Sequence, residues 1–253
     1  MTVLDVPFLV GVGLIGGVWN AVAGGATLFT FPALMWIGLP PVVANATNYV
    51  AMLPSNAAAL PAYRDELSAL APALPPLIIV TCLGALVGSL ALIWVDPELF
   101  LNLVPGLICL ATVLFACGER VRAWLVGSAG DKRSYLIVLG ALYVASIYGG
   151  FFGAGLGIIL LAIAQIVGFS AFHSANAVKN LLATCFTVIS IIVFGVGGLV
   201  AWPEAATMMV GSSVGGYLGG RLSHRVNDRL LRGAVIVFGA VLTLVYAVRQ
   251  FVL

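Results

Sequence analysis

The sequence predicts an all-α membrane protein that crosses the bilayer several times. Of its 253 residues, 62% are hydrophobic and only 8% are charged, whereas about a quarter of the residues in a soluble domain are charged. Too few charged side chains remain to cover a water-facing surface, so lipid must surround most of the chain. The apolar runs are continuous rather than alternating, which argues against a membrane β-barrel. Helices remain, because they satisfy their own backbone polar groups in hydrocarbon.

Apolar segments follow one another along the chain with short polar connections. They cover roughly residues 7–23, 26–38, 42–62, 72–95, 99–118, 134–148, 151–168, 175–200, 204–220 and 233–249. A helix needs about 20 apolar residues to cross a bilayer. The first two segments of each half are shorter than that, and a glycine-rich break joins them. We therefore expect 8–10 hydrophobic segments in total, of which these are short, broken or re-entrant.

The chain also repeats itself once. The run at 84–106 aligns without gaps on the run at 211–233, with three glycines in register. The tetrapeptide ANAT at 44–47 aligns with ANAV at 175–178. Two further glycine matches link 16–17 with 149–150 and 23–26 with 153–157. The constant order of these matches predicts two repeats of about five segments each.

Loop charges indicate how the two repeats lie in the membrane. The transmembrane repeats are residues 1–118 and 134–253, and the linker at 119–133 is basic, as is the loop at 221–232. The positive-inside rule places both connections in the cytoplasm. The acidic loop at 96–98 aligns with the second basic loop, so equivalent loops face opposite sides. This is typical of inverted repeats, whose binding sites lie near the membrane midplane, although a tandem duplication with accidental charges is the alternative. Counting crossings back from the linker places both termini outside, provided that the first two segments of each half form a hairpin.

Charged side chains avoid the predicted membrane segments, with one exception. All nine carboxylates fall in loops, at termini or at segment ends, and so do ten of the eleven basic residues. Lys179 alone lies inside a segment. The absence of a carboxylate there argues against a carboxylate proton relay and against a carboxylate-built cation site.

Amide and hydroxyl side chains accompany this lysine in both repeats. The candidate substrate-binding residues are Lys179, Asn45, Asn48, Asn176, Asn180, Thr27, Thr47, Gly24, Gly25, Gly155 and Gly157. The lysine would be the charge partner of the substrate, and the asparagines and threonines would be hydrogen-bond donors. The glycine breaks would bring the backbone close and create helix N-termini, which attract anions. Such a set, without an acidic group, is typical of a site for a small oxyanion.

Structural interpretations of the same residues stay open. Lys179 could lie at the membrane face with its ammonium in water. Asn45 and Asn176 could cap helices or form hydrogen bonds between helices. The four cysteines lie in or at the ends of apolar runs without a CxxC motif or a Cys/His cluster, so we expect neither a metal site nor a cofactor. The net charge of +2 gives no indication of a nucleic-acid partner.

Two glycine-rich runs resemble those of a known family. They are GG…AGGATLFTFPAL…GLPPVVANATN at 16–48 and YGGFFGAGLGIILLAI…GFSAFHSANAVKN at 148–180. Together with the two halves and the YRDEL loop, they resemble the sulfite exporter TauE/SafE family over nearly the whole chain. The resemblance implies a bacterial inner-membrane permease that moves sulfur-containing anions such as sulfite, sulfoacetate or other organosulfonates, often outward. The second run lacks the proline that Pro32 supplies in the first.

These observations lead us to expect a secondary transporter of small anions that works by alternating access between the repeats. Its partners would be the lipid bilayer and a small sulfur-containing anion. An anion channel shares every feature described so far except coupling. An intramembrane enzyme would need a nucleophile–base pair or metal ligands, and no recognisable spacing links the side chains available for either. The sequence carries no signature of the oligomeric state or the coupling ion.

Overall fold

The computed structural model describes residues 4–22, 25–57, 60–117, 135–167 and 172–222, together with isolated positions between and beyond them. Within this part of the chain the regular structure is entirely helical. The helices are α1 (Asp5–Val22), α2 (Thr27–Trp36), α3 (Pro41–Ala57), η1 (Leu60–Tyr63), α4 (Arg64–Leu70), η2 (Ala71–Ala73), α5 (Leu74–Trp94), α6 (Pro97–Ala116), α8 (Tyr135–Phe151), α9 (Leu156–Val167), α10 (Phe172–Val196) and α11 (Trp202–Leu222).

The all-α, multi-pass architecture is confirmed. Within the described residues, three helical stretches are long and apolar enough to cross a membrane, at Arg64–Trp94, Pro97–Leu114 and Ser174–Val196. Shorter apolar helices accompany them. The expected polar loop around the YRDEL sequence contains the short helices η1, α4 and η2. Most of the linker at 119–133 lies outside the described residues, and so do several positions of the expected segment at 233–249.

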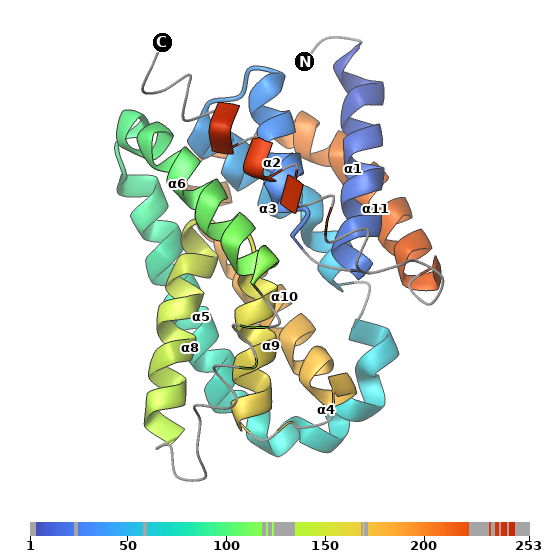
Figure 1. Ribbon diagram of the computed structural model, residues 1–253, viewed down its shortest axis with the longest axis vertical. Coiled ribbons are helices and arrows are strands. Elements are labelled where there is room, and N and C mark those ends of the chain that lie inside the picture. The colour runs from blue at the N-terminus through green and yellow to red at the C-terminus, as the bar shows by residue number, and fades with distance from the viewer. Residues whose placement is uncertain are drawn as a thin grey trace.

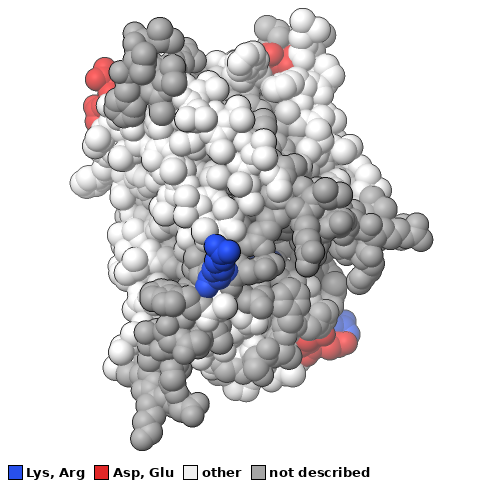
Figure 2. Space-filling view, in the orientation of Figure 1, with Lys and Arg blue, Asp and Glu red and all other residues white. Residues whose placement is uncertain are grey.

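Surface charge agrees with a membrane-spanning body. Figure 2 shows charged side chains near opposite ends of the molecule, and a broad middle band of described surface that carries one basic side chain. Trp36, Trp94 and Trp202 are exposed at helix ends, with 86%, 85% and 56% of their surface accessible. Tryptophans gather at membrane–water interfaces because one part of the indole is apolar and another is polar.

Two pairs of short helices are interrupted near the middle of the molecule. In Figure 1, α1 starts at the upper end and α8 at the lower end, and both stop near mid-height. The chain then turns into α2 and α9. The turns contain Gly25, Gly153 and Gly155, with φ of +81°, +71° and +77°. Side chains rarely tolerate this left-handed region, so glycine is required there. The prediction of short, broken helices is confirmed.

Close glycine contacts join α5 to α8. A methyl group added to Gly84 would lie 2.7 Å from the carbonyl oxygen of Tyr143, and one added to Gly88 would lie 2.0 Å from that of Ile147. Only glycine therefore allows the two backbones to approach this closely. Small residues are used in this way where helices pack inside membranes.

The packing of α11 on α1 repeats that of α5 on α8. A methyl group on Gly211 would lie 2.1 Å from the carbonyl oxygen of Val10, and one on Gly215 would lie 2.0 Å from that of Leu14. These four positions are the repeat counterparts of those in the α5–α8 contact. The central helices pack in the same way: α3 of the first half packs on α11 of the second, and α10 of the second half packs on α5 of the first. This packing supports the predicted repeat, whose inverted orientation in a membrane stays a prediction.

Candidate functional site

A cavity of about 90 Å³ lies between α3 and α10, beside the two helix breaks. From α3 it is lined by Asn48, Tyr49, Met52 and Asn56, and from α10 by Lys179, Asn180, Ala183, Phe186 and Thr187. Apart from Phe186, each of these α10 residues follows a lining residue of α3 by 131 residues, the offset of the predicted repeat. The cavity is therefore built largely from equivalent positions of the two halves. Its volume accommodates several water molecules, and so also a small anion.

Seven of the eleven predicted residues line this cavity. They are Gly25, Thr27, Asn48, Gly155, Gly157, Lys179 and Asn180. Gly24 lies outside the described residues. The structure thus brings together residues from both breaks and from both central helices, which are far apart in the sequence.

The other three predicted residues make structural hydrogen bonds elsewhere. Asn45 Nδ2 donates to the carbonyl of Phe151 (2.9 Å), the Ala201 N–H donates to Thr47 Oγ1 (3.0 Å), and Asn176 Nδ2 donates to the hydroxyl of Tyr63 (2.7 Å). These bonds tie α3 to α8, α3 to the start of α11, and α10 to η1. Asn45 and Asn176 therefore form hydrogen bonds between helices, which is one of the roles that the sequence left open for them.

Lys179 is the charged residue of the cavity wall, and the described lining includes no carboxylate. The residue is half-buried. Its Cδ would lie 3.9 Å from a methyl group on Gly157, so the aliphatic stem passes beside the start of α9. Within the described part of the chain its ammonium makes neither an ion pair nor a hydrogen bond. A cation without a partner in such a cavity favours an anionic ligand.

Amide groups extend the polar side of the cavity. Asn48 is only 2% exposed, and its Nδ2 lies 3.2 Å from Thr27 Oγ1. Its Oδ1 has no partner among the described groups. A half-turn of the amide would let the Thr27 hydroxyl donate to the oxygen and would free the NH₂ group for a ligand. Asn48 can therefore serve as a donor toward a bound anion.

A second amide cluster lies beside the first. Asn20 Nδ2 donates to Ser55 Oγ at 2.8 Å and to Asn56 Oδ1 at 2.7 Å. This leaves the NH₂ group of Asn56 available to the cavity, which both asparagines line. Asn56 and its repeat counterpart Thr187 were not among the residues predicted from the sequence. Extending the 131-residue offset two helical turns beyond Asn48 would have found both.

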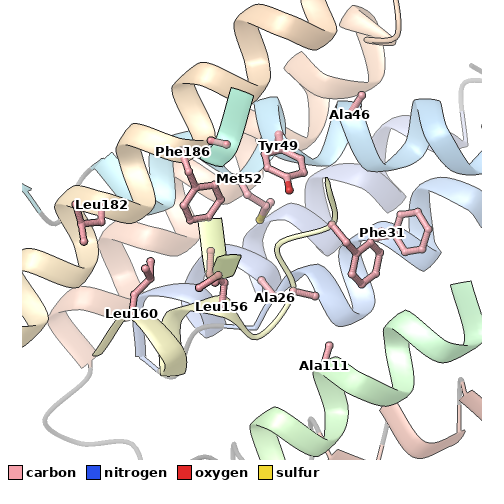
Figure 3. Close-up of a cluster of buried hydrophobic side chains, with 14 of the residues drawn as sticks. Ala26, Phe31, Ala46, Tyr49, Met52, Ala111, Leu156, Leu160, Leu182 and Phe186 are labelled. Carbon is pink, nitrogen blue, oxygen red and sulfur yellow. The ribbon is translucent and has the colours of Figure 1, made fainter. Parts of the chain in front are cut away.

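Apolar side chains form the remaining wall. Figure 3 shows Tyr49, Met52 and Phe186 projecting from α3 and α10 toward Ala26 and Leu156 at the two breaks. The rings of Tyr49 and Phe186 pack edge to face with centroids 6.4 Å apart. A polar ligand would therefore contact the amides and Lys179 on one side of the cavity. On the other side it would contact apolar side chains, which leave little room for water.

Hydrogen bonds from the first half hold the break between α8 and α9 in place. The last-turn carbonyls of α8 accept from three side chains of α3 and α5: Gly149 from the Tyr49 hydroxyl, Gly150 from the Ser89 hydroxyl (3.3 Å) and Phe151 from Asn45. Helix ends leave such carbonyls unpaired, and buried ones require partners. The start of α9 is thereby fixed beside Lys179.

A sequence-family comparison identifies the relatives of this protein. The family model for the sulfite exporter TauE/SafE matches residues 9–246. The chain belongs to the sulfite exporter TauE/SafE family. Membership of this family of membrane transporters means that the protein is a transporter rather than an enzyme.

Several curated relatives of this TauE/SafE member are named as transporters. A probable membrane transporter protein of Haemophilus influenzae is 28% identical over 236 residues, covering 92% of this chain and 90% of its own. The probable membrane transporter protein YfcA of Escherichia coli K12 is 28% identical, covering 94% and 89%. ORF9 of a Sinorhizobium species is 23% identical, covering 94% and 90%. No solved structure matches the chain at a significant level.

Proposed function

We propose that this TauE/SafE protein transports small sulfur-containing anions, sulfite or organosulfonates, across the bacterial inner membrane. The anion binds in the cavity between α3 and α10, with Lys179 as its charge partner. Asn48, Asn56 and Asn180 donate hydrogen bonds to it. The observation that carries this proposal is a lysine without a partner among the described residues, in a cavity whose other described lining residues are neutral. The family name supports the choice of sulfur anions.

Alternating access is the mechanism that this arrangement favours. The cavity is bounded by equivalent positions of the two halves, and glycine breaks lie on both sides of it. A rocking movement of one half against the other would expose the same site to each side in turn, as in other transporters with broken helices and midplane sites. In this proposal the central linker and the 221–232 loop are cytoplasmic, and both termini are external.

Replacing Lys179→Gln tests the site because it removes the charge while keeping most of the side-chain length. In proteoliposomes loaded with unlabelled sulfite, we expect the variant to require at least about tenfold more labelled sulfite for half-maximal counterflow, which corresponds to about 1.4 kcal/mol. Arg64→Gln is the matched control. Arg64 is 86% exposed in its side chain and does not line the cavity, so its loss should leave counterflow unchanged.

A wild-type affinity for sulfite in the Lys179→Gln variant would contradict the assignment of Lys179 to the binding site. Counterflow also separates a carrier from a channel, because an external label accumulates against an internal unlabelled pool only when the two anions exchange on one site. Conductive flux without counterflow would contradict alternating access while leaving anion transport in place.

A further inference from the structure

The charge balance of the cavity sets a limit on the charge of its ligand. Lys179 is the charged side chain among the residues that line it. Asn48, Asn56, Asn180 and Thr187 add hydrogen bonds but no net charge. Arg64, Asp65 and Glu66 belong to α4, which packs on α10, but none of them lines the cavity. The described side chains of the cavity therefore provide a single positive charge.

Helix ends do not change this balance to first order. The N-termini of α2 and α9 lie at the breaks, and each contributes about half a positive charge. The C-termini of α1 and α8 lie at the same breaks, and each contributes about half a negative charge. The two positive and two negative ends offset one another, which leaves the charge of Lys179.

A second negative charge on the ligand would lack a counter-charge. Met52, Phe152 and Phe186 form part of the wall, so water can solvate such a charge only on the amide side. Burial of an unpaired charge is strongly unfavourable, much more so than burial of a hydrogen-bonded neutral group. We infer that the cavity selects monoanions, such as hydrogensulfite or a monosulfonate, and discriminates against dianions. The inference rests on the anion-binding role proposed above.

The repeat offers a way to change this selectivity by one residue. Asn48 is the repeat counterpart of Lys179, and both line the cavity. Asn48→Lys would place a second positive charge at the equivalent position of the other half. The double variant Asn48→Lys with Lys179→Asn would keep one charge and move it across the cavity.

The test compares two sulfonates of the same carbon length with the purified full-length protein in detergent. Isethionate carries one negative charge at neutral pH, and sulfoacetate carries two. Isothermal titration should show isethionate binding at least about tenfold tighter to the wild type. Asn48→Lys should reverse the order, the charge-relocated double variant should retain it, and Asn48→Gln, which adds no charge, should also retain it. Equal or tighter binding of sulfoacetate by the wild type would overturn the inference.

A pH series with sulfite provides a second measurement that needs no variant. As pH rises through the second ionisation of sulfite, hydrogensulfite becomes the dianion, so its binding should weaken. Isethionate keeps one charge over the same range and corrects for changes in the protein itself. Sulfite binding that stays level or strengthens relative to isethionate would overturn the inference. If sulfite and both sulfonates fail to bind at any pH, the proposed function itself is wrong.

Discussion

An ammonium group inside a membrane-spanning helix is costly unless water or an anion accompanies it. Lys179 lies in such a helix, and the structure places it on the wall of a cavity. The sequence alone left a position at the membrane face equally open, because a stem of four methylenes can carry the charge several ångströms away. The packing of α3 and α9 around α10 determines which of these two positions Lys179 takes.

The asparagines show how one residue type serves two purposes. Asn48 and Asn180 line the cavity, whereas Asn45 and Asn176 bind Phe151 and Tyr63. All four lie within a few residues of one another in their segments, and the repeat pairs Asn45 with Asn176. Which amide faces a cavity depends on the rotation of its helix against neighbours, which spacing within one helix does not specify.

Tyr49 gives a residue-scale prediction about stability. Its buried hydroxyl donates to the carbonyl of Gly149, so Tyr49→Phe would leave that carbonyl unpaired. We expect a loss of about 1 kcal/mol or more in the free energy of unfolding, measured by thermal unfolding in detergent. Tyr135→Phe is the control because Tyr135 is 46% exposed, and it should unfold like the wild type. Equal stability of the two variants would show that the Tyr49 bond contributes nothing net.

At the scale of elements, the breaks and the close helix contacts account for several of the 30 glycines of this chain. Glycines with positive φ end α1 and α8 early and start α2 and α9 beside the cavity. Glycines inside α5 and α11 instead let a neighbouring backbone approach. The first group permits a turn and the second permits close packing. Substitutions in the first group should therefore strain the backbone, whereas those in the second should push two helices apart.

Gly88→Ala provides a test of the packing group. The added methyl would lie 2.0 Å from the Ile147 carbonyl oxygen, so α5 and α8 must separate and the midpoint of thermal unfolding should fall. Gly140→Ala is the matched control on α8, because nothing lies within 4 Å of the added methyl. The control should keep or gain stability, by up to about 1 kcal/mol, since alanine is the better helix former. An unchanged unfolding midpoint in Gly88→Ala would contradict the close contact.

At the scale of the whole molecule, the pairing of the two halves creates the site. Each half contributes a broken helix pair and one central helix, and the same positions of α3 and α10 meet at the cavity. Neither half by itself encloses the cavity. The cavity therefore follows from the association of the halves and from nothing within one of them.

The proposed membrane orientation leads to a labelling prediction. Glu98 at the start of α6 and Ser68 in α4 are both exposed, and they lie on opposite sides of the crossing helix α5. In intact cells, a membrane-impermeant maleimide should label Glu98→Cys, while Ser68→Cys should react only after permeabilisation. The unsubstituted chain gives the background from its four cysteines. The reverse pattern would contradict the placement of the linker and termini.

The sequence by itself determined the membrane class, the helical content, the positions of the breaks and the family, since all of these follow from composition, local spacing or short motifs. It also predicted seven of the residues that line the cavity. Only the tertiary structure decided that Asn45, Thr47 and Asn176 bind other helices, and that Asn56 and Thr187 join the wall. The physical reason is that hydrophobicity and backbone preference act along the chain, whereas the direction of a side chain is fixed by the helices that pack against it.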